Sequence, residues 1–484
     1  MPPVGLEPRE EAMRENLQHP IFQIIGDLAD KEKVECYVVG GYVRDRVMQR
    51  PFNNDVDLVV IGSGIDFAAK LGDTIGANVT VYKSFGTAML VHDGIHLEFV
   101  GARKESYRSD SRKPIVEDGT LEDDQNRRDF TVNAMAYCLN ADRFGELVDP
   151  FGGLEDMQNR VIRTPLDPNI TFSDDPLRMM RAIRFATQLN FKIDVKAIQA
   201  IVENAERIKI ISRERITDEL NKIILATKPS VGFRYLFDTG LLKIIFPAMY
   251  NLQGVDVIDG RAHKDNFYHT LEVLDNVASL SDDLWLRWAA IMHDIAKPAT
   301  KRFDKRVGWT FHGHEDRGAR MVPKLFAELK LPLHDKMKFV QKLVQLHLRP
   351  IVLAQDIVTD SAVRRLLYEA GDDIDALMLL CHADVTTKNE FKKKKYRNNF
   401  ELVKQKLKDV EERDKIRNWQ PPVTGEDIMA LFEIGPGRVV GSIKSAVREA
   451  ILEGEIPNSR KEALAFILNY GKALGLSAKT DVAL

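Results

Sequence analysis

The sequence VVGGYVRD at residues 38–45 is followed after a short gap by NNDVDLVV at residues 53–60. The first run passes from an apolar strand through Gly40 and Gly41 into a predicted helix that carries Arg44. Two glycines let the backbone approach a ligand closely, and a helix N-terminus favours phosphate oxygens. The two runs predict a phosphate-binding strand–turn–helix unit followed by a second strand.

The second run places two carboxylates where its strand begins. Asp55 and Asp57 are two residues apart, and the alternation of a strand directs both side chains to one face. Adjacent like charges are unfavourable unless something compensates them, as paired divalent cations would. Two-metal nucleotidyl transfer requires such a pair. The alternative interpretation is a polar strand entry with a turn-forming Asn-Asn-Asp sequence.

Short β-branched runs elsewhere in the first third predict more of the same sheet, with a helix at Asp66–Ile75 between them. From about residue 170 the helical period replaces the strand pattern. We therefore predict an α+β head with a small mixed sheet, followed by helical regions only. The predicted strands are Val34–Val39, Val56–Ile61, Asn78–Tyr82, Ala88–His92 and His96–Val100.

The glycine turn and the Asp-x-Asp pair, at this spacing, resemble the nucleotidyltransferase core of the polymerase-β superfamily. In particular they resemble the tRNA nucleotidyltransferases (CCA-adding enzymes) and the bacterial poly(A) polymerases. Four further motifs follow in the order of that family, so the resemblance covers roughly residues 20–250. They are RRDFTVNAMA at 127–136, DPFGGLED at 149–156, DDPLR at 174–178 and SRERI at 212–216, followed by Glu219.

The resemblance implies roles for these residues. Asp55 and Asp57 would bind two catalytic Mg²⁺ ions, and Gly40, Gly41 and Arg44 would contact the triphosphate. Asp175 and Arg178 would bind the Watson–Crick edge of the incoming nucleotide, because an acceptor and a rigid donor fork match a mixed base edge. The expected nucleotide-binding set also includes Arg128, Asp129, Asn133, Arg181 and Arg184.

An alternative applies to the base-binding pair. With Pro176 at the first helical position, Asp175 is expected at the N-cap, and Asp175 with Arg178 would then be a simple i,i+3 pair. The chain also departs from the family at Asp174, where glutamate is usual. Residues 160–215 contain 11 basic and 7 acidic side chains, a local excess that fits a phosphate pocket or an ordinary solvated helix face.

Two features beside the head site lead to weaker expectations. Glu98 lies in a neighbouring strand and is a candidate third carboxylate, with an ordinary sheet-surface glutamate as the alternative. Residues 104–126 are polar and rich in turn formers, which predicts a flexible loop.

Histidines concentrate in a second region, since eight of the eleven fall within residues 263–382. The order of His269, His293-Asp294 and Asp384 resembles the HD-domain metal-dependent phosphohydrolases. Imidazole and carboxylate suit divalent metals, and ligands on separate helices can converge at a bundle core. Adjacent helical residues diverge by about 100°, so His293 and Asp294 can share an ion only near a helix end. The sequence following at residues 296–298 (AKP) supplies such a break.

The same resemblance adds further residues. His314 and His347 are candidate ligands of a second HD metal, and Lys297 is expected near a substrate phosphate. The metal would be Mg, Mn, Ni or Fe, and the implied activity is phosphatase, 2′-nucleotidase or cyclic phosphodiesterase. His263 and His334 are expected at the surface.

Composition sets the remaining expectations. The 484 residues suggest three or four domains, and the net charge of −3 requires any positive field to be local. The three cysteines are far apart, and no apolar run approaches the ~18 residues of a membrane helix, which predicts a cytoplasmic protein with no membrane partner. No feature of the sequence indicates an oligomeric state.

We predict four regions: a head at 18–160, a helical neck that reads the base at 161–255, an HD domain at 256–388 and a helical tRNA-binding tail at 389–484. The expected activity is addition of CCA to the tRNA 3′ end from CTP and ATP. A-only, CC-only or poly(A) addition shares these motifs and stays open. So do an enzyme that acts mainly through its HD domain and a non-enzymatic RNA-binding scaffold.

Overall fold

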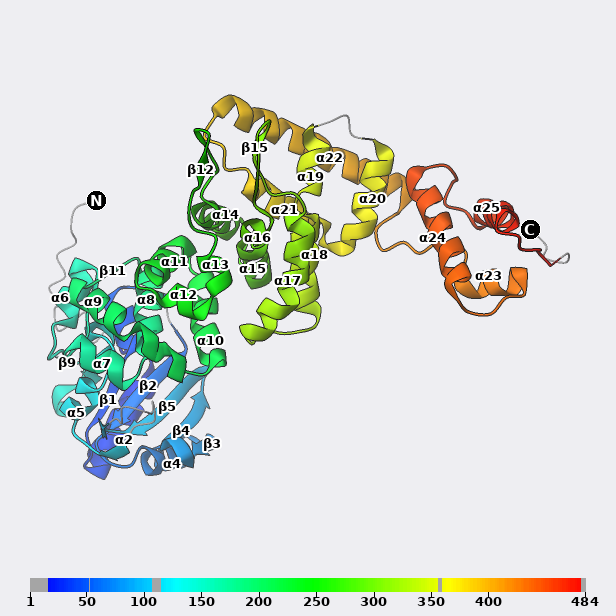
Figure 1. Cartoon of the computed structure of the whole chain (residues 1–484). Helices are drawn as coiled ribbons and strands as arrows, with labels where there is room; N and C mark the ends of the chain where they lie inside the picture. The colour runs from blue at the N-terminus through cyan, green and yellow to red at the C-terminus, as the bar shows by residue number, and fades with distance from the viewer. Residues whose placement is uncertain (1–15, 52, 107–114, 356–358, 480–484) are drawn as a thin grey trace. The chain divides into compact units, whose positions relative to one another are not determined.

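The computed structural model describes residues 16–479, apart from residues 52, 107–114 and 356–358. The chain divides into two compact units, Met1–Pro247 and Ala248–Leu484. In the first, a sheet is covered by helices, and the second is built almost wholly of helices (Figure 1). The α+β head followed by helical regions confirms the predicted fold class. No described helix has the length and apolar content needed to cross a bilayer.

The head is built on a seven-stranded sheet with the order β3-β4-β5-β2-β1-β8-β9. Its central pair, β2 and β5, is parallel, and every other neighbouring pair is antiparallel. All five predicted strands are present. The strands are β1 (Cys36–Val39), β2 (Asp55–Val60), β3 (Val79–Tyr82), β4 (Thr87–His92), β5 (Ile95–Gly101), β8 (Ala136–Cys138) and β9 (Leu147–Val148).

Three helices pack on this sheet: α2 (Pro20–Glu32), α3 (Gly41–Val47) and α4 (Gly64–Ile75). Gly26 lets α2 approach the end of β8, because a Cβ at this position would overlap the backbone oxygen of Leu139. The alternating apolar residues of the strands form the core, as at Tyr37, Val39 and Val59. At the N-terminal end of β2, Asp55 and Asp57 lie on the face directed away from the core and are exposed to solvent.

The loop prediction at residues 104–126 was wrong for most of its described part. Arg103–Ser106 (β6) pairs antiparallel with Ile115–Asp118 (β7), and Leu121–Asn126 forms α5. A capping box explains the helix, since the Thr120 hydroxyl accepts from the Asp123 N–H while the Asp123 carboxylate accepts from the Thr120 N–H. Residues 107–114 of that prediction lie outside the described residues.

The rest of the first unit is mainly helical, with a short pair of strands. Leu177–Leu189 (α8) is at its centre and packs against α10 (Arg213–Ile224) and α11 (Pro229–Asp238). Both α8 and α10 bury an apolar face. The helix α8 also carries Arg178, Arg181 and Arg184. The other elements are α6 (Gly153–Asn159), α7 (Pro168–Asp174), α9 (Val195–Asn204), α12 (Leu241–Ile245) and the parallel pair β10 (Val161–Ile162) and β11 (Lys192–Ile193).

In the second unit the helices α14 (Asn266–Leu280), α15 (Leu284–Met292), α17 (His314–Glu328), α18 (Asp335–Leu346) and α21 (Ile374–Asp384) pack together. Two β-hairpins join the bundle, β12 (Val257–Ile258) with β13 (Arg261–Ala262) and β14 (Arg302–Asp304) with β15 (Gly308–Thr310). The remaining helices are α13 (Pro247–Tyr250), α16 (Lys297–Thr300), α19 (Arg349–Gln355), α20 (Asp360–Ala370), α22 (Glu390–Asp414), α23 (Gly425–Phe432), α24 (Arg438–Glu453) and α25 (Arg460–Ala473).

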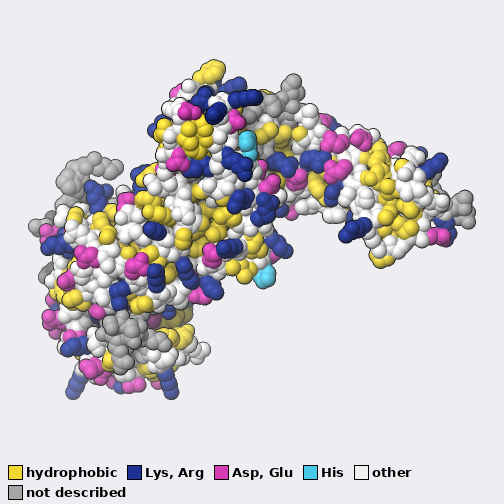
Figure 2. Space-filling view, viewed as in Figure 1, with side chains coloured by type: hydrophobic (Ala, Val, Ile, Leu, Met, Phe, Trp, Pro, Cys, Tyr) yellow, Lys and Arg dark blue, Asp and Glu magenta, His cyan; other side chains and the backbone are white. Residues whose placement is uncertain are grey.

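Basic and acidic side chains are intermixed over the visible face of the molecule (Figure 2). On α22 this mixture takes the form of local pairs, such as Lys393 with Glu390 and Lys404 with Glu401. This is the solvated pattern expected of a nearly neutral chain.

Candidate active sites

The head site begins with three carboxylates on one face of the sheet. Asp55 and Asp57 point away from the core at the start of β2, while Val56 between them is buried. Glu98 on β5 is the direct register partner of Asp57. Loss of hydration beside the neighbouring groups raises the pKa of the Asp57 carboxyl, with a further rise from Asp55. Burial and the charge of Asp57 likewise raise the pKa of Glu98.

Such a cluster fits a divalent cation. Mutual repulsion among close carboxylates is relieved when a cation binds between them, and oxygen ligands are those that Mg²⁺ prefers. Asp55 and Asp57 thus share one face at the entry of β2, with Glu98 beside Asp57 on β5, and metal binding by the three stays a prediction.

The glycine turn lies directly beside these carboxylates. Gly40 has φ +73°, a left-handed conformation that side-chain-bearing residues rarely adopt, and it precedes α3. A Cβ on Gly40 would lie 3.5 Å from Nη1 of Arg128 and 3.7 Å from Oδ2 of Asp57. The turn, the acidic strand entry and Arg128 thus surround one small space, in which a triphosphate would meet backbone N–H groups and a guanidinium.

A buried aspartate fixes the two arginines of the RRDF motif. Asp124 is fully buried and accepts from Arg127 (Nη2, 2.6 Å) through one oxygen and from Arg128 (Nε, 3.0 Å) through the other. Although burial opposes its ionisation, the two arginines outweigh that effect and lower the pKa of Asp124. Asp124 was absent from the predicted site, yet its i,i+3 and i,i+4 spacing to both arginines is a signal that could have identified it.

A second chain of contacts connects Arg44 with Arg181. Arg44 donates to Oδ1 of Asn133 (2.8 Å), and the Asn133 amide donates to Oδ1 of Asp129 (3.3 Å). Oδ2 of Asp129 accepts from Nε of Arg181 at 2.7 Å. Burial opposes ionisation of Asp129, but Arg181 lowers its pKa below the usual range. The ring of Phe185 lies 5.2 Å from the guanidinium carbon of Arg44 and 5.3 Å from that of Arg181.

A cavity of about 360 Å³ opens between the head and α10. Asp175, Arg178 and Arg181 line it. Arg178 also donates to the backbone oxygen of Arg127 (2.6 Å), which orients its guanidinium. The other residues that line the cavity are Arg127, Arg128, Asp129, Leu177, Arg215, Asp218, Glu219 and Lys222.

The expected N-cap position of Asp175 is shifted by one residue, because Pro176 is the N-cap of α8. Oδ1 of Asp175 accepts from the Leu177 N–H at the start of α8 (3.1 Å), and the helix begins one residue later than predicted. Arg184, another residue of the predicted nucleotide-binding set, does not line this cavity. It is directed inward, pairs with Glu219 at 2.6 Å and lies over the ring of Phe185 at 4.2 Å.

The histidine region forms a second centre. α15 ends at Met292, so His293 is its C-cap and Asp294 follows beyond the helix, as the break at residues 296–298 predicted. His269 lies in the first turns of α14, and Asp384 is the last residue of α21. His314 begins α17, and His347 is the C-cap of α18. All six predicted HD residues therefore lie at or near helix ends.

The ligand atoms fall into two groups, His269 with His293 and Asp384, and Asp294 with His314 and His347. Within each group the atoms lie within 4.8 Å of one another. Asp294 contacts both groups, since Oδ2 lies 3.3 Å from Nε2 of His293 while Oδ1 lies 3.2 Å from Nε2 of His314. Asp384 Oδ1 lies 2.8 Å from Nε2 of His269.

Three of the histidines are oriented for metal binding. The Nδ1 atoms of His293, His314 and His347 face the backbone oxygens of Ala290, Phe311 and Val344 at 2.6–2.8 Å. A proton on each Nδ1 leaves the Nε2 lone pair directed into the centre, and metal-binding histidines are commonly held by such a bond from the other ring nitrogen. Nε2 of His293 is buried without a hydrogen bond of good geometry. This inward-facing nitrogen fits a bound cation.

The charge state of the centre agrees with this fit. Burial lowers the pKa of His293, but Asp294 and Asp384 outweigh it and raise that pKa to about 10. Burial and the nearby His293 lower the pKa of His347 to about 4. A cation would replace the proton on His293 as the positive charge that buried carboxylates require.

Two lysines border the HD centre. Lys297 Nζ lies 2.7 Å from Oδ2 of Asp294, where the sequence expected a phosphate-facing lysine. Lys264, which was not predicted, lies 2.9 Å from Nδ1 of His269. The surface prediction for His263 was wrong: its side chain is 4% exposed and packs against Trp309 and Phe311.

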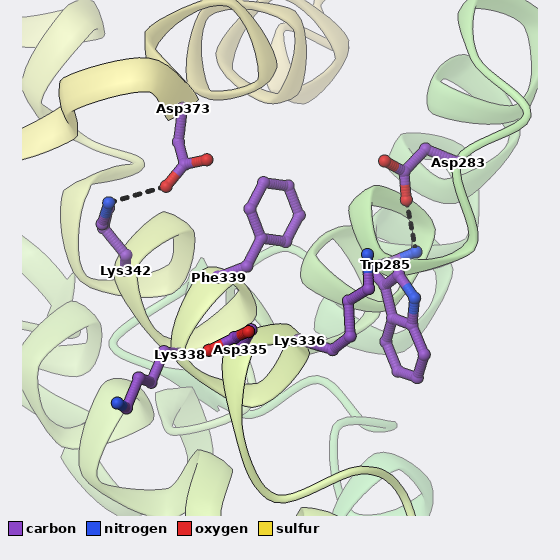
Figure 3. A pocket seen from close by; sticks show the side chains of 8 residues that line it. All are labelled: Asp283, Trp285, Asp335, Lys336, Lys338, Phe339, Lys342 and Asp373. Atoms are coloured by element: carbon purple, nitrogen blue, oxygen red, sulfur yellow. Dashed lines mark hydrogen bonds and ion pairs between the residues drawn. The ribbon is translucent and has the colours of Figure 1, made fainter.

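A separate cavity of about 460 Å³ lies in the second unit (Figure 3). Trp285 on α15 and Phe339 on α18 face it, and Lys342 donates to Oδ2 of Asp373 at its edge (2.6 Å). Asp283, Asp335, Lys336 and Lys338 complete the lining, and no predicted site residue is among them.

Comparison with known proteins covers most of the chain. Residues 36–163 match the poly A polymerase head domain, residues 190–252 match the probable RNA- and SrmB-binding site of polymerase A, and residues 266–389 match the HD domain.

Relatives and solved structures are consistent with these matches. An A-adding tRNA nucleotidyltransferase of Deinococcus radiodurans is 34% identical over 365 residues, 73% of this chain and 80% of that protein. A multifunctional CCA protein of Shewanella frigidimarina is 30% identical over 75% of this chain and 86% of its own length. A tRNA nucleotidyltransferase solved with a primer tRNA and an ATP analogue matches with a TM-score of 0.56 and 25% identity, over 79% of this chain and 98% of that one.

The glycine turn, the acidic strand entry, the arginine-lined cavity and the six HD residues all lie within or beside the matched segments. The chain therefore belongs to the family of tRNA nucleotidyltransferases with a poly A polymerase head domain, and it carries an HD domain in addition.

Proposed function

We propose that this protein is a cytoplasmic enzyme that adds C, C and A to the 3′ end of tRNA, using CTP and ATP. The observation that carries the proposal is the convergence of Asp55, Asp57 and Glu98 beside the Gly40 turn. Divalent cations, Mg²⁺ in our proposal, would activate the terminal ribose hydroxyl and stabilise the pyrophosphate leaving group.

The protein's own residues supply binding and orientation. Gly40 and Gly41 admit the triphosphate to the backbone, and Arg128, held by Asp124, is placed for electrostatic contact with it. Asp175 and Arg178 meet the base edge in the cavity beside α10. Holding the nucleotide at both ends converts the transfer into an effectively intramolecular reaction, which is the main catalytic contribution of such a site.

Addition of A alone is the second candidate for the head. It is favoured by the 34% identical relative, which is named an A-adding enzyme. Purified protein incubated with tRNA lacking its last three nucleotides, with CTP and ATP singly and together, separates the candidates. CCA addition requires incorporation of C from CTP alone, and restoration of the full end with both nucleotides. Incorporation of A only, and only on tRNA that already ends in CC, would replace our proposal with the A-adding one.

We also propose that the HD centre is a divalent-metal phosphohydrolase. Its support is the pair of ligand groups joined by Asp294, with Lys297 beside them to hold a phosphate. The candidate ions are Mg, Mn, Ni and Fe. Asp55→Asn should abolish nucleotide addition and leave phosphate release intact, and Asp294→Asn should do the reverse. Loss of both activities in either single variant would contradict two independent centres.

The tail, residues 389–484, is proposed to contact tRNA. Its support is the lysine run Lys392–Lys395 on α22 and the helix that begins after Gly437. Lys393 pairs with Glu390, and Lys404 further along α22 pairs with Glu401, so the contribution of α22 to affinity is expected to be modest.

A further inference from the structure

The two β-hairpins of the second unit form one continuous lobe. Arg261 on the first hairpin donates to the backbone oxygens of Lys305 (3.3 Å) and Arg306 (3.2 Å) on the second. Trp309 on the second returns a bond from Nε1 to the backbone oxygen of Arg261 (2.9 Å). In Figure 1 the labels β12 and β15 mark these hairpins next to one another. These reciprocal bonds hold the hairpins as a single surface, which we name the hairpin lobe (residues 256–264 and 297–311).

The hairpin lobe is continuous with the HD centre. The first hairpin leads through Lys264 into α14, which carries His269, and the second fills the interval between Asp294 and His314. Lys297 joins the two regions directly, because its ammonium lies 2.7 Å from Oδ2 of Asp294 and 5.5 Å from the centre of the Phe311 ring. A ligand whose end reaches the metal ligands would therefore extend over the lobe.

The charge of the lobe favours an anion. It contains seven basic side chains and three acidic ones, in a chain whose net charge is −3. Two of the acids are already engaged: Asp256 pairs with Lys301, and Asp304 accepts from the N–H groups of Arg306 and Val307 in the turn. Arg302, Lys305 and Arg306 are exposed, and within the described residues no ion pair is recorded for them. A row of unpaired cations suits a chain of phosphates better than a single phosphate.

Aromatic rings lie between these cations. Trp309 packs edge-on against His263 and Phe303, with ring centres 5.1 and 5.3 Å apart, and it remains partly exposed. Lys301 lies over the Trp309 ring at 5.6 Å. Aromatic rings interleaved with cations are the combination that binds single-stranded nucleic acid, since bases stack on the rings while the cations follow the backbone.

We propose that the hairpin lobe binds the single-stranded end of an RNA and guides its terminal phosphate into the HD centre. The substrate of that centre is then a phosphorylated RNA terminus rather than a free mononucleotide. This inference rests on the proposed phosphohydrolase function. The class of partner follows from the cations and rings of the lobe, and its being RNA follows from the family to which the chain belongs.

The test compares two substrates that share one reacting end. Full-length protein, loaded with Mn²⁺ or Ni²⁺, is given a short RNA that ends in a 2′,3′-cyclic phosphate and, separately, 2′,3′-cyclic CMP. Lys305→Gln/Arg306→Gln removes two lobe charges. It should raise KM for the RNA about fivefold or more, because each lost phosphate contact weakens binding and its salt dependence. Its KM for cyclic CMP and its kcat for both substrates should not change.

The matched control is Lys336→Gln/Lys338→Gln, which removes two exposed lysines from the separate cavity of the same unit (Figure 3). This control should leave KM for the RNA unchanged. An equal rise in both double variants, or no rise in the lobe variant, would overturn the inference.

A binding measurement keeps the inference testable if the centre hydrolyses neither substrate. RNA with 4-thiouridine at its last base is photocrosslinked to the Asp294→Asn protein, and the attached peptide is identified by mass spectrometry. Attachment within residues 297–311 supports the lobe even if the phosphohydrolase proposal fails. Attachment only within the first unit would overturn the inference while leaving the phosphohydrolase proposal to its own assay.

Discussion

Asp57 and Glu98 are opposite each other in the parallel register of β2 and β5, so their carboxylates share one face of the sheet. Loss of hydration raises the pKa of both carboxyls; the charge of Asp57 raises the pKa of Glu98 further, and the charge of Asp55 raises that of Asp57. The parallel pairing is what brings this about, because it sets the entries of both strands side by side, with Asp55 opposite His96 and Asp57 opposite Glu98. Glu98 is therefore expected to act with Asp55 and Asp57 on the same cations.

Glu98→Gln should lower kcat for nucleotide addition by about 100-fold, because it removes one charged oxygen ligand from the carboxylate cluster. Steady-state incorporation of labelled ATP measures the change. The control is Asp93→Asn in the turn after β4, where the side chain is exposed and belongs to no cluster. Full activity in Glu98→Gln would assign Glu98 to the sheet surface only.

Arg178→Lys should reduce discrimination between the correct and incorrect nucleotide by about 10-fold or more. A lysine is a point charge and cannot reproduce the rigid donor fork that meets a base edge. The ratio of kcat/KM values for ATP and UTP on tRNA ending in CC measures this discrimination. Arg143→Lys, at an exposed ion pair with Glu146, provides the matched control. An unchanged ratio in Arg178→Lys would exclude it from base recognition.

Asp294→Asn should lower the metal content of both HD ligand groups, because its two oxygens face different groups. His347→Ala should affect one group only and lower the content by about one equivalent per chain. Elemental analysis of protein dialysed against Mn²⁺ measures both. The exposed His334, changed to alanine, should leave the content unchanged. Equal losses in Asp294→Asn and His347→Ala would contradict a shared aspartate.

Asp124→Asn should destabilise the head by about 3 kcal/mol at pH 7, since it leaves two arginines without their buried partner. The folded pKa of Asp124 lies below its unfolded value of about 3.9. Its contribution is therefore fully present above that unfolded value and is lost as pH falls through the folded pKa. Calorimetric unfolding should show a lower head transition for the variant at pH 7, and a smaller difference from the parent near pH 3.

The ends of individual helices and strands could be predicted from the sequence more reliably than the contacts between segments far apart in the chain. The strand entry at Asp55 and the helix end at His293 follow from local alternation and from the following Ala-Lys-Pro, so both could be predicted. The inward turn of Arg184 could not, because it depends on Glu219, which α10 brings from 35 positions along the chain. The pairing of Arg103–Ser106 with Ile115–Asp118 was likewise hidden, since these short exposed strands carry no hydrophobic alternation.

The same limit applies to His263. Nothing near it in sequence indicates that Trp309 and Phe311 will cover its ring. A lone polar residue in a turn-rich segment is most often exposed, and only the approach of the second hairpin removes it from water.

The contacts that run from Arg44 through Asn133 and Asp129 to Arg181 have a thermodynamic consequence. In the proposed enzyme these hydrogen bonds would connect Arg44, the predicted triphosphate contact, with Arg181, which lines the cavity proposed to hold the base. A base that shifts Arg181 would change the free energy with which Arg44 binds the triphosphate. By linkage, a triphosphate that shifts Arg44 would change the affinity for the base. Recognition of the two ends is then non-additive, so the cost of a wrong base depends on whether the phosphates are present.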